Sequence, residues 1–121
     1  MKINQNNAGL AAEQLAVTYL TNHGLKIVAQ NYHCRFGEID LIMKDGKTLV
    51  FVEVRLRSNP KFGSAAASIT LQKQQKLILT AQHYLQEHSR QHGDCACRFD
   101  AILMAKVDVE LIEWLRNAFD A

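Results

Sequence analysis

The sequence lacks any long apolar run, and this absence limits where the protein can reside. No stretch of its 121 residues approaches the roughly 20 consecutive apolar residues that a membrane-spanning helix needs. The first residues, MKINQNNAGLAAEQLA, contain one lysine but no continuous apolar segment, so we expect no signal peptide. Together the two absences predict a cytoplasmic protein with no membrane partner.

Cysteine is scarce, and its number is odd. The three residues, Cys34, Cys95 and Cys97, are most simply reduced thiols in a cytoplasmic chain. Cys95 and Cys97 follow His88 and His92, so this segment holds four residues of the types that bind zinc. However, its Cys-x-Cys spacing differs from the wider spacing of structural zinc sites, and the motif is therefore only a weak indication of zinc binding.

Acidic residues are missing from one long segment. Between Arg55 and Gln86 the chain has no Asp or Glu, although the formal net charge of the whole chain is only +2. A local basic segment indicates an anionic partner, most commonly nucleic acid, but a solvated basic face would have the same composition. The basic residues of this segment are Arg55, Arg57, Lys61, Lys73 and Lys76.

The composition is that of an ordinary folded protein, and the length suits one compact domain. The second long helix is long enough to act as a crossover, so the strand after it should lie parallel to the second hairpin strand. We therefore expect an α/β fold with a mixed sheet and helices packed on it. The predicted elements are a helix over 8–22, a strand over 25–33, a hairpin over 36–57, a loop over 58–68, a helix from 68–70 to 88–91, a strand over 97–105 and a short amphipathic helix over 109–119.

Charged side chains interrupt the apolar hairpin FGEIDLIMKDGKTLVFVEVRLR. Charges inside a sheet are costly unless they are paired or hold something. If the Asp-Gly pair forms the turn, strand alternation places four charged side chains on one side, with Asp40 and Glu53 as diagonal neighbours. The four are Glu38, Asp40, Glu53 and Arg55, and the opposite side is apolar, with Ile39, Leu41, Val50, Val52 and Val54.

Two carboxylates placed in this way can converge on one divalent cation. Mg²⁺ prefers oxygen ligands and needs only one or two protein carboxylates. Arg55 lies two residues beyond Glu53 on the same side, within reach of a phosphate bound to such a metal. This combination suits metal-assisted cleavage of a phosphodiester. The alternative is a hairpin with a hydrated outer face, whose charges form surface ion pairs worth about 0–1 kcal/mol.

Several motifs taken together resemble one known family. The motifs GEIDLI, VFVEVRLR, FGSAAASIT, CRFDAI and IEWLRNAF look like those of the YraN family of small bacterial proteins, and the resemblance covers nearly the whole chain. That family is similar to the restriction-endonuclease-like nucleases, nearest to archaeal Holliday-junction resolvases. The resemblance implies a single endonuclease-like domain over residues 1–121, with an αβββαβ core followed by the short C-terminal helix.

The resemblance also implies roles for individual residues. The nuclease signature is an Asp followed, on the next strand, by Glu/Asp-x-Lys, and here Asp40 matches the first acid and Glu53 the second. Glu13 in the first helix matches an additional acid of the resolvase-like metal site, although it could equally be a solvent-facing helix residue. The implied cofactor is Mg²⁺ or Mn²⁺ bound by these three carboxylates, and the implied partner is nucleic acid, above all DNA.

Arg55 departs from the signature, which has lysine at this position. Arginine is not deprotonated in proteins and cannot act as a general base. It can still bind a phosphate bidentately and stabilise charge in the transition state. The chain could therefore be a metal-dependent endonuclease for DNA, including branched DNA, in which Asp40, Glu53, Arg55 and Glu13 form the catalytic set. The alternative is a catalytically inert module that only binds nucleic acid.

Two further expectations concern partners. In either function Arg55, Arg57, Lys61, Lys73 and Lys76 would contact the nucleic-acid backbone, largely without sequence preference. A homodimer would suit a branched substrate. A third option is a protein-interaction adaptor, in which Trp114 and Phe119 lie on an exposed face of the C-terminal helix, although core packing is the more common use of such a stripe.

Overall fold

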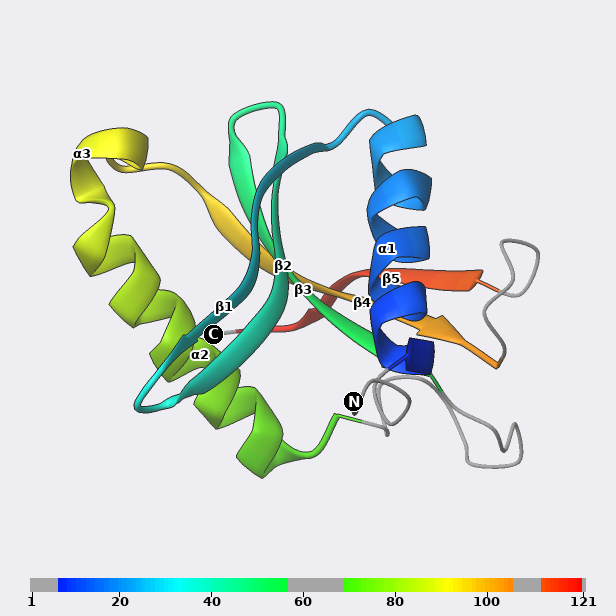
Figure 1. The fold of residues 1–121 in the computed structure, drawn as a ribbon. Coiled ribbons are helices and arrows are strands. Elements are labelled where there is room, and N and C mark those ends of the chain that lie inside the picture. The colour runs from blue at the N-terminus through cyan, green and yellow to red at the C-terminus, as the bar shows by residue number, and fades with distance from the viewer. Residues whose placement is uncertain (1–6, 57–68, 106–111, 121) are drawn as a thin grey trace.

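A computed structural model describes residues 7–56, 69–105 and 112–120, and its centre is a five-stranded sheet with a helix on each face (Figure 1). The strand order is β1-β2-β3-β4-β5, in which β3 and β4 are parallel and the other neighbours are antiparallel. The predicted mixed α/β sheet and the parallel crossover are therefore confirmed. The elements are α1 (Asn7–Asn22), β1 (Lys26–Cys34), β2 (Gly37–Asp45), β3 (Thr48–Leu56), α2 (Leu71–Glu87), α3 (Ser89–His92), β4 (Cys97–Met104) and β5 (Ile112–Phe119).

The two long helices form where the sequence predicts them. In α1, Ala12, Ala16 and Leu20 recur every four residues and bury one face against the sheet. The start of α2 is fixed by Thr70, whose hydroxyl oxygen accepts a hydrogen bond from the backbone N–H of Lys73 at 3.1 Å. No helix within the described ranges combines the length and the apolar character needed to cross a membrane.

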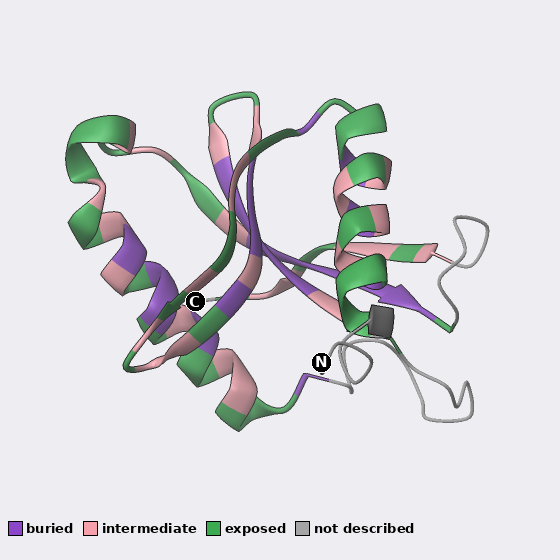
Figure 2. Cartoon of the chain, viewed as in Figure 1, coloured by how far each residue is buried: buried purple, intermediate pink, exposed green. Residues whose placement is uncertain are grey.

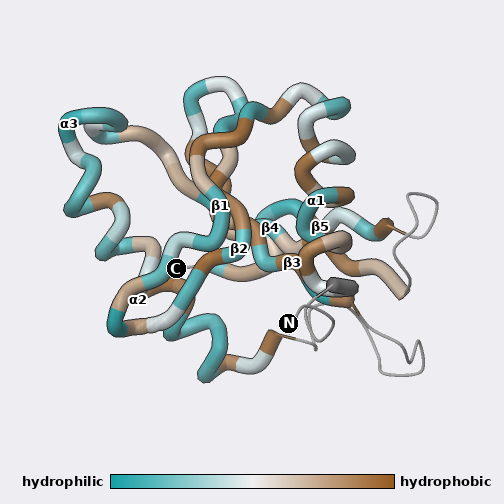
Figure 3. The backbone as a smooth tube through the Cα atoms, in the orientation of Figure 1, coloured by the Kyte–Doolittle hydropathy of each residue, from teal (hydrophilic) through white to brown (hydrophobic). Residues whose placement is uncertain are grey.

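The core consists of two apolar clusters on opposite faces of the sheet, and Figure 2 shows the buried positions concentrated in the central strands. Figure 3 shows the same strands as the most hydrophobic part of the chain, whereas the hairpin tip and α3 are hydrophilic. Both faces of the paired part of the hairpin are covered by apolar clusters, so this part has no hydrated outer face. The α1-side cluster contains Ala12, Ala16, Leu20, Leu25, Leu41, Met43, Val50, Val52, Ile102 and Met104. The α2-side cluster contains Ile39, Ile42, Leu49, Phe51, Ile69, Leu77, Ala81, Tyr84, Phe99 and Ala101.

The hairpin turn lies one residue later than predicted. Asp45 pairs with Thr48, so the two loop residues are Gly46 and Lys47. Gly46 has a φ of 61°, as a glycine at the first central position of a tight hairpin turn allows. Each residue of β2 therefore pairs with a residue of β3 two positions away from the predicted partner. The prediction that Asp40 and Glu53 are diagonal neighbours is wrong. Because the shift is an even number, it does not exchange the two faces of the strands.

Side-chain alternation in β2 breaks at Asp40, which the hairpin pattern does not predict. Ile39 and Ile42 both lie in the α2-side cluster, whereas Leu41 lies in the α1-side cluster. The prediction that Ile39 shares a face with Leu41 is therefore wrong. The break has a partner in β1, where Asn31 lies between the residues paired with Leu41 and Ile39 and has a φ of 52°. Asn tolerates this left-handed conformation better than most residues, which permits the irregularity.

The C-terminal segment is a strand and not the predicted helix. β5 pairs antiparallel with β4 through Trp114 and its neighbours. The buried carboxylate of Asp100 in β4 fixes this pairing, because it accepts hydrogen bonds from Trp114 Nε1 at 3.0 Å and from the backbone N–H of Asn117 at 2.9 Å. Phe119 stacks on Phe99 with ring centroids 4.7 Å apart. Both aromatic side chains thus pack within the fold and are not an adaptor face.

Candidate functional site

The candidate site lies where β2 and β3 separate. The two strands pair from the turn to Leu41 and Val52 and then diverge, with β2 running toward α2 and β3 toward the first turns of α1 (Figure 1). Asp40 and Glu53 are the next residue on each strand. Helix α1 packs on β3 and α2 packs on β2, so both helices can contribute side chains to the fork. We call Glu13, Asp40 and Glu53, with the adjacent cations Arg55 and Lys73, the carboxylate site.

Asp40 is held across the fork by β3. Its Oδ2 accepts a hydrogen bond from the backbone N–H of Val54 at 2.8 Å, which replaces a strand-to-strand bond at this level. Burial raises the pKa of the Asp40 carboxyl, and the negative charge of Glu38 raises it further. The Val54 hydrogen bond and the charge of Lys73 lower this pKa but do not offset the burial.

Glu13 reaches Asp40 from helix α1. Burial and then the charge of Asp40 raise the pKa of the Glu13 carboxyl, while a hydrogen bond from the Asn31 side chain lowers it. Hydrogen bonding between the two acids raises the pKa of Glu13 and lowers that of Asp40. Glu13 is therefore half-buried beside a second acid and is not a solvent-facing helix residue.

Glu53 approaches the site from the α2 side of the sheet and is 5% exposed. Its Oε2 lies 3.3 Å from Lys73 Nζ and 3.5 Å from Arg55 Nη1. Burial and then the charge of Asp40 raise the pKa of the Glu53 carboxyl, and the two cations lower it. The net direction is upward, so two nearby cations do not fully offset the burial of this charge beside another acid.

Three carboxyls with raised pKa values in one partly buried fork form a set that a divalent cation would stabilise. Their oxygen atoms are the ligand type that Mg²⁺ and Mn²⁺ prefer. Within 7–56, 69–105 and 112–120 no group of three His, Cys, Asp or Glu side chains is placed to hold a metal ion together. The donor set therefore suits only a cation that takes one or two protein carboxylates and fills its other positions with water or phosphate oxygens.

The remaining predicted residues lie at varying distances from this centre. Glu38 is exposed and acts on the site only through its charge. Lys76 is exposed on α2, one turn after Lys73. Arg57 and Lys61 lie outside the described residues, and their predicted contacts with nucleic acid stay predictions.

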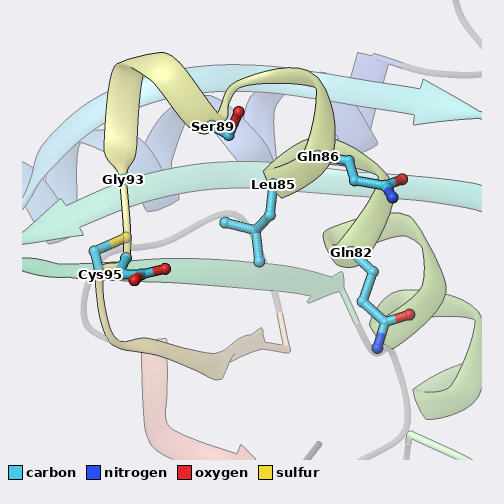
Figure 4. Close-up of a pocket in the computed structure, with 7 residues that line it drawn as sticks. Gln82, Leu85, Gln86, Ser89, Gly93 and Cys95 are labelled. Carbon is cyan, nitrogen blue, oxygen red and sulfur yellow. The ribbon is translucent and has the colours of Figure 1, made fainter.

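The segment that contains His88, His92, Cys95 and Cys97 has contacts typical of a structural role. Burial and the neighbouring Cys95 raise the pKa of the Cys97 thiol to about 11, so the thiol is protonated at neutral pH in the metal-free chain. His92 Nε2 shares a hydrogen bond of 2.7 Å with the Tyr84 hydroxyl. A pocket of about 570 Å³ lies nearby, at the C-terminal end of α2, with Gln82, Leu85 and Cys95 in its lining (Figure 4). Its lining contains no Lys, Arg or His, so it has no feature that favours a nucleic acid.

Sequence reasoning underestimates one contribution to the carboxylate site and misses another. From its place early in the second helix, Lys73 could lie near the site, but the sequence favours a solvated helix start; the structure pairs Lys73 with Glu53. Asn31 carries no sequence motif, and it combines the left-handed backbone opposite Asp40 with a hydrogen bond to Glu13. The sequence feature that indicates Lys73 is its position at the start of α2, the helix that connects β3 to the neighbouring parallel strand β4. For Asn31 the only signal was its residue type within a strand.

Comparison with known proteins gives a consistent assignment. A model of the uncharacterised protein family UPF0102 matches residues 12–104. A UPF0102 protein of Methylobacillus flagellatus is 60% identical over 110 residues, which cover 91% of this chain and 94% of that protein. A UPF0102 protein of Nitrosomonas europaea is 55% identical over 114 residues, which cover 94% of both chains. A UPF0102 protein of Legionella pneumophila is 53% identical over 113 residues, covering 93% of this chain and 94% of that one.

Proposed function

The chain belongs to the uncharacterised protein family UPF0102, the YraN family, and we propose that it is a metal-dependent endonuclease with a restriction-endonuclease-like fold that acts on DNA, including branched DNA. The observation that carries this proposal is the carboxylate site. Two strand acids and one helix acid meet at a fork in the sheet, and all three have raised pKa values. Two cations lie on the most deeply buried of these acids.

The roles of the residues follow from their places in the fork. Asp40 and Glu53, with Glu13 beside them, would hold Mg²⁺ or Mn²⁺. When bound there, such a cation would make water a better nucleophile and would offset negative charge at the phosphorus atom. Arg55 would donate two parallel hydrogen bonds to phosphate oxygens, which stabilises the charge that develops during cleavage.

The basic residues around the site support a polyanionic substrate. Arg55 and Lys73 are each about one-third exposed, so their charged groups can contact a ligand at the surface. Lys76 continues the positive charge along α2. Phosphate contacts of this kind position a nucleic acid without reading its sequence. A substrate chosen by shape, such as a junction or a flap, is consistent with such contacts, and we include a homodimer in the proposal because two sites could then act on two strands.

The test is cleavage by the purified protein. Labelled junction, flap and linear duplex DNA are incubated with the protein and Mn²⁺, Mg²⁺ or EDTA, and the products are separated by size. We expect cleavage that needs the divalent cation and is abolished in Asp40→Ala and Glu53→Ala. Circular dichroism and thermal melting of each variant establish that it is folded. Absence of cleavage by the wild type, or equal cleavage by Asp40→Ala, would contradict the proposal.

One observation favours the second candidate, an inert module that binds nucleic acid. Arg55 lies against Glu53 where the signature has lysine, and arginine cannot exchange a proton. This candidate predicts salt-dependent DNA binding that Asp40→Ala leaves intact or strengthens, because the substitution removes a negative charge from the site. Fluorescence anisotropy at several salt concentrations measures this binding. No binding at low salt would contradict both candidates.

A further inference from the structure

Lys73 occupies a place that a contact to the nucleic-acid backbone alone does not explain. Its Nζ lies 3.3 Å from Glu53 Oε2, the same oxygen that Arg55 approaches from two residues along β3. The charge of Lys73 also lowers the pKa of Asp40, so it acts on both strand acids. We infer that Lys73, supplied by α2, takes the role of the lysine that the nuclease signature places at position 55. This inference rests on the proposed function.

The position of Lys73 in its helix supports a role outside the helix. The first turn of α2 contains no acidic residue, and Lys73 lies in that turn. The positive end of the helix dipole makes a cation there unfavourable for the helix itself. The Thr70 cap nevertheless holds the Lys73 backbone N–H at 3.1 Å and so fixes where the side chain begins. An ion pair with a buried acid of β3 is the interaction that offsets the unfavourable position.

The two cations on Glu53 differ in chemistry. Arg55 presents a planar, permanently charged fork that matches a phosphate, whereas Lys73 carries a compact ammonium with three donors. In hydrolysis, the oxygen of water forms a bond to phosphorus and the bond from phosphorus to the leaving sugar oxygen breaks. The proton of the water passes to solvent, and the sugar oxygen takes a proton from solvent. In this step the Lys73 ammonium would donate to a phosphate oxygen and offset the charge that develops there, while Arg55 binds the phosphate.

A first experiment measures metal binding without substrate. Titration calorimetry with Mn²⁺ compares the wild type with Lys73→Ala and with a matched control, Lys47→Ala. Lys47 is exposed and lies in the turn at the opposite end of the hairpin. Because Lys73→Ala removes a cation adjacent to the metal ligands, we expect it to bind Mn²⁺ several-fold more tightly, whereas Lys47→Ala should match the wild type. Equal Mn²⁺ affinity in the two variants would overturn the inference.

A second experiment measures cleavage and its rescue. Loss of a transition-state donor typically lowers kcat by about 10²–10³-fold, and we expect a loss of this size in Lys73→Ala but not in Lys47→Ala. The double variant Arg55→Lys/Lys73→Ala restores the usual signature and should recover much of the lost activity. Wild-type activity in Lys73→Ala would overturn the inference about Lys73 but not the proposed function. The same holds if the double variant recovers no activity while Lys73→Arg stays active. A wild type that neither binds Mn²⁺ nor cleaves DNA would overturn the proposed function and the role of Lys73 with it.

Discussion

Replacement of Asp100 by Asn should destabilise the fold by several kcal/mol. Asp100 is 1% exposed, and each of its carboxylate oxygens accepts two hydrogen bonds. Oδ1 accepts from Arg98 Nε at 3.0 Å and from the Asn117 backbone at 2.9 Å. Oδ2 accepts from Arg98 Nη2 at 3.1 Å and from Trp114 Nε1 at 3.0 Å. An amide group must place its NH₂ against two of these donors, whichever way it turns.

The expected loss follows from these four bonds. Two buried donors are left unsatisfied, at about 1–3 kcal/mol each. The ion pair with Arg98 is also broken, but Arg98 keeps its contact with Asp45 at 3.0 Å, which limits the additional loss. We therefore expect Asp100→Asn to lower the free energy of unfolding by about 3–5 kcal/mol. For a chain of this size that corresponds to a Tm decrease of about 10–20 °C.

Urea unfolding monitored by the fluorescence of the single tryptophan, together with calorimetry, measures this loss. The matched control is Asp94→Asn, the same substitution at an exposed position, which should change stability by less than about 0.5 kcal/mol. A decrease below about 1 kcal/mol in Asp100→Asn would refute the reasoning, because it would mean that the Asp100 carboxylate does not hold β5 to β4.

Three further predictions concern the carboxylate site and its surroundings. The pKa values of Asp40 and its neighbouring acids are raised in the folded chain, so their contribution to stability is present at low pH and is lost as pH rises above the ordinary values of 3.8–4.5. Without divalent cations, Asp40→Asn should therefore raise the Tm at pH 7 but not at pH 3.5, and equal changes at the two pH values would contradict this. Gly37→Ala should lower stability by about 1–3 kcal/mol in urea unfolding, because Gly37 has a φ of 152° and a Cβ there would lie 3.2 Å from Thr80 Oγ1. In DNA-binding titrations, Lys76→Ala should reduce the slope of log K against log salt by about 0.9, and an unchanged slope would show that Lys76 contacts no phosphate.

Short-range patterns in the sequence predict most of the elements, and long-range pairing explains where they fail. The apolar spacing of α1, the Thr70 cap of α2 and the crossover between β3 and β4 are local features or follow from connection length. The C-terminal segment has apolar residues that fit either a helix or a strand. The segment forms a strand because it pairs with the edge of β4 and because the buried Asp100 carboxylate accepts a hydrogen bond from Trp114. Both partners lie outside the C-terminal segment, so its own sequence does not indicate them.

The candidate site was predictable as a set of residues but not as a geometry. Motif spacing identifies Asp40, Glu53 and Arg55, and the structure brings them together with Glu13 at the fork. Alternation along an ideal strand would place Ile39 and Leu41 on one face, but the two side chains lie in opposite clusters. The break lies beside the left-handed Asn31 of β1, and a backbone conformation of this kind is set by tertiary context. The pairing of Lys73 with Glu53 likewise depends on how α2 packs against the sheet.

The carboxylate site has parts from α1, β2, β3 and α2, so it exists only when nearly the whole fold has formed. A ligand that binds this site therefore binds the folded chain and has no equivalent place on the unfolded one. Binding then adds directly to stability, by about 2.7 kcal/mol when the free ligand is at a hundred times its Kd. The free energy of unfolding therefore rises with the concentration of free ligand. Resistance to proteolysis and the Tm would both report how far the site is occupied, without an assay of any reaction.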